Sequence, residues 1–68
     1  MNYLETCSFI DVHGDSWHFT HGEDLEGHWY RVTDITGHQV CFSRNMQMPF
    51  GAWVSELILG TWLRADHT

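Results

Sequence analysis

The chain has 68 residues and carries nine acidic residues against three arginines, with no lysine, so its formal net charge is −6 at pH 7. A chain this short forms a single domain, residues 1–68, with a marginal core, and three scattered arginines exclude a phosphate-binding patch for nucleic acid. No apolar run reaches the ~18 residues of a membrane span. Because no basic and apolar leader segment is present, we expect a cytoplasmic protein in which Cys7 and Cys41 are separate reduced thiols.

Residues 5–20 predict a β-hairpin, because apolar residues recur at alternate positions on both sides of Gly14-Asp15. These two residues suit the centre of a type II′ turn. The pairs in that register are Val12 with Trp17, Asp11 with His18, and Ile10 with Phe19. Four apolar side chains then share one face, and a carboxylate lies across from a histidine.

Residues 21–27 are polar and rich in glycine, a composition typical of a loop. They contain three of the nine acids, Glu23, Asp24 and Glu26. Because carboxylates in a polar loop are ordinarily solvated, they do not indicate a shaped catalytic pocket. We expect an exposed acidic loop.

A second hairpin is predicted from residue 28 to about residue 44. Asp34-Ile35-Thr36-Gly37 fits a type I turn closed by a left-handed glycine. The pairs in that register are Trp29 with Phe42, Tyr30 with Cys41, and Arg31 with Val40. One face then carries Trp29, Val40 and Phe42, and the other carries Tyr30, Val32 and Cys41. Because both faces are apolar, we expect each to be covered, one by a helix and one by a partner.

From Pro49 the apolar period changes to that of an amphipathic helix. The residues with helical spacing are Phe50, Trp53, Val54, Leu57, Ile58 and Thr61. Pro49 is compatible with the first turn, and Gly60 can end the helix. Residues 61–64 would then form an extended tail or a last strand. A helix that continued past Gly60 would instead expose a second apolar strip of Leu59, Trp62 and Leu63.

These elements predict an α+β fold, in which two antiparallel β-hairpins form a small sheet and one C-terminal amphipathic helix packs on it. The alternative is a small five-stranded β-barrel that the C-terminal tail closes.

Six histidines raise the possibility of a metal site. The sequence has no close ligand pairs of the kind that structural zinc sites use, and no nucleotide-binding or metalloprotease motif. Neither cysteine lies in an electropositive setting that would activate a thiol. We therefore expect no catalytic, cofactor or metal site.

Four tryptophans exceed the needs of so small a core, and Trp, Tyr and Arg dominate protein interfaces. We expect a small acidic protein-binding module that occupies a partner's surface, such as a phage or mobile-element inhibitor or adaptor. The partner would be a protein with a basic surface, or a second copy in a homodimer. The candidate contact residues are Trp29, Tyr30, Trp62, Leu63, Glu23, Asp24 and Glu26. The alternatives are a histidine-dependent metal-binding domain and a minimal enzyme subunit.

Overall fold

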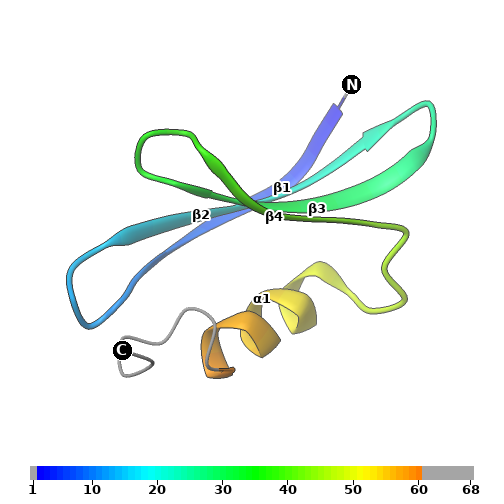
Figure 1. The fold of residues 1–68 in the computed structure, drawn as a ribbon. Coiled ribbons are helices and arrows are strands. Elements are labelled where there is room, and N and C mark those ends of the chain that lie inside the picture. Colours follow the sequence, from blue (N-terminus) through cyan, green and yellow to red (C-terminus); the bar gives the residue numbers. More distant parts are fainter. Residues whose placement is uncertain (1, 61–68) are drawn as a thin grey trace.

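The computed structural model describes residues 2–60, which form four antiparallel strands followed by one helix (Figure 1). The elements are β1 (Asn2–Ile10), β2 (Ser16–Asp24), β3 (Gly27–Asp34), β4 (Gln39–Arg44) and α1 (Phe50–Leu59). Each strand pairs with its neighbour in sequence, and the sheet order is β1-β2-β3-β4. Because β1 and β4 are free edges, the sheet is open. The predicted α+β fold is confirmed and the barrel alternative is wrong. The predicted tail or strand at 61–64 lies outside the described residues.

All three turns between strands begin with aspartate and have glycine three residues later. These turns are Asp11–Gly14, Asp24–Gly27 and Asp34–Gly37. In each, the aspartate Oδ1 accepts the backbone N–H two residues on, at 2.9 Å. The glycines have φ values of 85°, 115° and 87°, in the left-handed region that side chains disfavour. This local chemistry fixes where each hairpin reverses.

The first hairpin differs from its predicted register. Its turn starts at Asp11, so Trp17 pairs with Phe9 and not with Val12. The Asp11 carboxylate accepts the backbone N–H groups of His13 and Asp15 and the indole N–H of Trp17. It therefore caps the turn, and the predicted Asp11–His18 pair is wrong. The shift is odd, so Phe9 faces the core while Val12 and Ile10 are 85% and 66% exposed.

The predicted acidic loop at 21–27 is also wrong. Strand β2 continues to Asp24, and a two-residue turn leads directly into β3. The reason is that the Asp24 side chain and Gly27 together make a tight turn, so a longer loop is not needed. The paired strands β2 and β3 become the centre of the sheet.

In the second hairpin the predicted turn at Asp34–Gly37 is confirmed. Its register differs, because Phe42 pairs with Arg31 and not with Trp29. A bulge between Val32 and Thr33 contributes to the change. The net shift is even, so Trp29 and Phe42 share one face and Val32 and Cys41 share the other, as predicted. The placement of Val40 beside Trp29 and Phe42 is wrong, because Val40 lies at the bulge and packs against the core.

Helix α1 covers one face of the sheet, and the core lies between them (Figure 1). The core consists of Phe19, Tyr30 and Val32 from the sheet and Phe50, Trp53 and Val54 from the helix. Pro49 precedes the helix, and its carbonyl accepts the Trp53 N–H. The helix ends at Gly60, as predicted, and the Gly60 N–H donates to the carbonyl of Glu56. No helix within residues 2–60 is long and apolar enough to cross a membrane.

Candidate functional site

The sheet face opposite α1, here called the open face, carries a group of aromatic and arginine side chains. This open-face cluster consists of Tyr3 from β1, Trp29 and Arg31 from β3, and Phe42 and Arg44 from β4. The ring of Trp29 meets the Tyr3 ring edge-on at 6.0 Å and stacks on Phe42 at 5.8 Å. These neighbours leave Trp29 only 2% exposed, although it lies on the face that the helix does not cover. Tyr3 and Phe42 remain 62% and 41% exposed, so an aromatic surface is presented outward.

Two arginines lie over these rings. The guanidinium of Arg31 is 4.8 Å from the Trp29 ring centroid and 6.0 Å from that of Tyr3, and Arg44 is 5.5 Å from that of Phe42. Such cation–π contacts attract the guanidinium charge to the face of the ring. Arg31 forms no ion pair with residues 2–60. The N–H groups at its Nε and at Trp29 Nε1 are buried and donate to no described residue.

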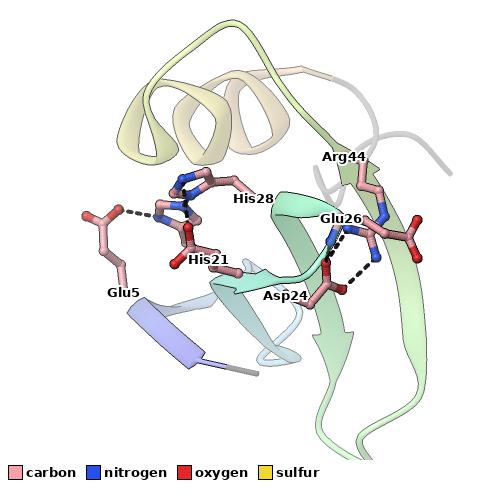
Figure 2. A network of polar contacts seen from close by, with 7 residues as sticks. Glu5, His21, Asp24, Glu26, His28 and Arg44 are labelled. Carbon is pink, nitrogen blue, oxygen red and sulfur yellow. Dashed lines mark hydrogen bonds and ion pairs between the residues drawn. The ribbon is translucent and has the colours of Figure 1, made fainter.

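Arg44 differs from Arg31 because it is already paired. Its Nη1 and Nη2 donate to the two carboxylate oxygens of Asp24 at 2.9 and 2.8 Å (Figure 2). This fork holds the pKa of Asp24 down at about 2 and raises the pKa of Arg44. Asp24, a predicted partner contact, therefore has both oxygens engaged within the chain.

The other predicted contact residues do not gather on one surface. Glu23 lies on the helix-covered face with its Oε2 3.4 Å from His28, while Glu26 is exposed at the tip of the β2–β3 turn. Tyr30 is a core residue, 7% exposed, whose hydroxyl donates to the Met48 carbonyl at 2.7 Å. Trp62 and Leu63 lie outside the described residues. Trp29 is the one predicted contact that belongs to the open-face cluster.

On the helix-covered face, two histidines link two glutamates in one chain of polar contacts. Glu5 Oε2 lies 2.8 Å from His21 Nδ1, and His21 Nε2 lies 3.0 Å from His28 Nδ1 (Figure 2). His28 Nε2 in turn faces Glu23 Oε2 at 3.4 Å. The His21 side chain is 14% exposed, with the Phe50 ring stacked on it at 5.8 Å. We call this arrangement the histidine chain.

In the part of the chain that the structure describes, the histidine chain included, no group of three or more His, Cys, Asp or Glu side chains could hold a metal ion. The thiols are poor nucleophile candidates. Burial raises the pKa of Cys7, with the nearby Glu5 charge acting in the same direction, and burial also raises the pKa of Cys41.

Sequence reasoning missed most of both sites. The open-face cluster depends on Gly22, which pairs with Trp29 and leaves space for the indole to lie on the β2 backbone. A signal for the true registers was present in the three Asp-x-x-Gly segments, of which only the last was interpreted as a turn. With those turns in place, the pairing that brings Glu5, His21 and Tyr30 into one row follows.

Comparison of this chain with protein-family models, with curated proteins and with solved structures gave no match.

Proposed function

We propose that this chain is a protein-binding module that docks through the open face of its sheet. The observation that carries the proposal is the open-face cluster, in which exposed Tyr3 and Phe42 flank the buried Trp29, with Arg31 over Trp29 and Arg44 over Phe42. Tyrosine, tryptophan and arginine are the residues that contribute most of the binding energy at protein interfaces. The cluster is also supported from below by paired strands, so it is ordered before a partner arrives.

The charges of the open face favour a partner segment that carries a carboxylate next to an apolar side chain. Asp24 is the only described acid on this face, and Arg44 already neutralises it. Arg31 is left with a charge that no described carboxylate balances. The remaining described acids lie on the helix-covered face, in the turns or on α1: Glu5, Asp11, Asp15, Glu23, Glu26, Asp34 and Glu56. An acidic partner group therefore meets the cationic face of a protein whose net charge is −6.

The partner expected here differs from the one predicted from composition alone, which was a protein with a basic surface that contacts Glu23, Asp24 and Glu26. Glu23 lies on the helix-covered face, Asp24 on the open face and Glu26 in a turn, and Asp24 is already paired with Arg44. A second copy of the chain would bring another Arg31 and, among residues 2–60, no free carboxylate on the same face, so a homodimer through this face is the less favoured alternative. A phage or mobile-element inhibitor or adaptor remains one form that such a module could take, by analogy of size and acidity.

Selection of a phage-displayed random peptide library on the immobilised domain tests the proposal. We expect enriched peptides to combine Asp or Glu with aromatic or aliphatic residues, and their affinity to fall at least tenfold in Arg31→Gln and in Phe42→Ala. Ile35→Ser removes a side chain that is 75% exposed at the β3–β4 turn, away from the cluster, and should leave affinity unchanged. Enrichment of Lys- and Arg-rich peptides, binding insensitive to Arg31, or preferential binding of a single-stranded oligonucleotide offered in parallel would each overturn it.

A further inference from the structure

The histidine chain holds a fixed number of protons, which can be counted from its geometry. Its three contacts join four groups in the order Glu5, His21, His28, Glu23. Each contact needs one proton between its two heavy atoms to be a hydrogen bond. Two neutral imidazoles supply two protons, and ionised carboxylates supply none. One contact is therefore left without a proton when both rings are neutral.

The contact that lacks a proton is identified by starting at Glu5 and following the histidine chain to Glu23. The count alone allows the empty contact at either carboxylate; the shorter of the two, 2.8 Å at Glu5 against 3.4 Å at Glu23, is assigned the proton, so neutral His21 carries its proton on Nδ1. Its Nε2 is then an acceptor, and His28 must donate from Nδ1. The remaining nitrogen, Nε2 of His28, carries a lone pair that faces the Glu23 carboxylate. Both neutral rings are thus held in the Nδ1–H tautomer.

The distances agree with this count. The two contacts that hold protons measure 2.8 and 3.0 Å, while the one in which two acceptors face each other measures 3.4 Å. One added proton on Nε2 of His28 would turn this third contact into a charge-assisted hydrogen bond, which is shorter and stronger than a neutral one. A second added proton would place two N–H groups head-on between the rings and break the bond that joins them.

Among residues 2–60, the elements around the histidine chain supply no further charge. The two carboxylates of the histidine chain come from β1 (Glu5) and β2 (Glu23). Strand β3 adds the neutral ring of Tyr30, 5.0 Å from the His21 ring. Helix α1 contributes Phe50, which carries no charge. Asp24 and Arg44 lie on the opposite face of the sheet. The four groups carry a charge of −2 with neutral rings, since two carboxylates are ionised, and one proton reduces this to −1.

We propose that the His21–His28 pair is a proton-binding site that takes up a single proton, at Nε2 of His28, and shares it with Glu23. The site is independent of the proposed docking face. Because the third hydrogen bond exists only in the folded protein, uptake of the proton at this site is coupled to folding. A metal ion suits the site less well, because carboxylates occupy both outer nitrogens and only two nitrogens remain for an ion that prefers four ligands.

Long-range ¹H–¹⁵N NMR of the histidine rings, recorded from pH 8.5 to pH 5, tests the assignment directly. At high pH we expect Nδ1 of both rings to be protonated and both Nε2 atoms to be unprotonated. As the pH falls, Nε2 of His28 should become protonated first, while Nε2 of His21 keeps its acceptor shift. Nε2–H tautomers at high pH, or simultaneous and equal protonation of both rings, would overturn the proposal.

The variant Glu23→Gln distinguishes the effect of the added proton on stability from a general effect of charge. The glutamine amide can donate to Nε2 of neutral His28, so the third bond forms without a proton. We expect the thermal midpoint of this variant to depend less on pH than that of the wild type. Glu26→Gln removes the same charge at the turn tip and should behave as the wild type. Equal pH dependence in the wild type and Glu23→Gln would contradict the proposal, as would stoichiometric Zn²⁺ binding that displaces the Nδ1 proton of His28.

Discussion

Trp29 lies flat over Gly22 on the neighbouring strand, so closely that a Cβ atom at position 22 would overlap the indole ring. The backbone of Gly22 is itself buried by this contact. The pair explains how a tryptophan on an uncovered sheet face becomes almost inaccessible, and why the aromatic and arginine side chains can assemble around it. A glycine within a strand often marks such a close approach.

We predict that Gly22→Ala destabilises the protein by about 1–3 kcal/mol, because the methyl group forces the indole off the strand. Loss of Trp29 packing should also be visible as a red shift of tryptophan fluorescence before unfolding. Urea titration followed by fluorescence gives both quantities. Gly51→Ala is the matched control, since nothing lies within 4 Å of a Cβ there and alanine favours the helix by up to about 1 kcal/mol. Equal stability of the two variants would show that the indole is not packed on Gly22.

The Asp24–Arg44 fork predicts an acid-sensitive contribution to stability. The pKa of Asp24 is lowered from 3.8 to about 2, chiefly by the hydrogen bonds from Arg44. A lowered pKa in the folded state means that the contribution is present above about pH 4 and is lost as the pH falls toward 2. Asp24→Asn keeps an oxygen that can accept the Glu26 N–H but removes the charge. We expect its thermal midpoint to be lower than that of the wild type at pH 6, with the difference shrinking at pH 2. Asp15→Asn, an exposed loop carboxylate, provides the comparison, and a difference that persists unchanged at pH 2 would contradict the charge-based account.

The Asp11 carboxylate predicts how the first turn responds to substitution. Hydrogen bonds from the Trp17 indole, followed by those from the backbone of Asp15 and His13, lower its pKa. Asp11→Ala removes every acceptor, whereas Asp11→Asn retains one for the turn. We expect the thermal midpoint to fall most in Asp11→Ala, less in Asp11→Asn and least in Asp15→Ala. If Asp11→Ala and Asp15→Ala have the same thermal midpoint, the turn does not depend on Asp11.

The two cysteines are predicted to stay unpaired within one chain. Both are free, and they lie on the two opposite edges of the sheet, at the ends of the row Cys7, Phe19, Val32, Cys41. Three strand spacings separate them by about 14 Å, about twice the Cα–Cα distance that a disulfide can span. Because burial raises the pKa of both thiols, alkylation by iodoacetamide should be slow at pH 7 and accelerate with pH, with exposed Cys7 reacting before Cys41. Mass spectrometry follows the reaction, and a monomer that has lost two hydrogens after mild oxidation would refute the topology.

The sequence by itself determined the elements whose cause is local. The helix from Phe50 to Leu59 follows from its apolar spacing and from Gly60 at its end, and the turn at Asp34 follows from one aspartate and one glycine. Most of the two faces of the second hairpin was predictable, because an even shift in register leaves side chains on their own face; Val40, at the bulge, is the exception.

Only the tertiary structure decided which residues of neighbouring strands lie opposite each other. Composition did not reveal that Gly22 meets Trp29, because that contact needs β2 and β3 to pair around the turn at Asp24–Gly27, a segment whose composition suggested a loop. Pairing of β2 with both β1 and β3 places Glu5, His21 and His28 within hydrogen-bonding distance, although Glu5 lies 16 residues before His21 in the sequence. Strand pairing is cooperative and non-local, so a shift of one residue exchanges the faces of a whole strand. Both candidate sites of this protein are built from such contacts, and for that reason they emerge only once the sheet is formed.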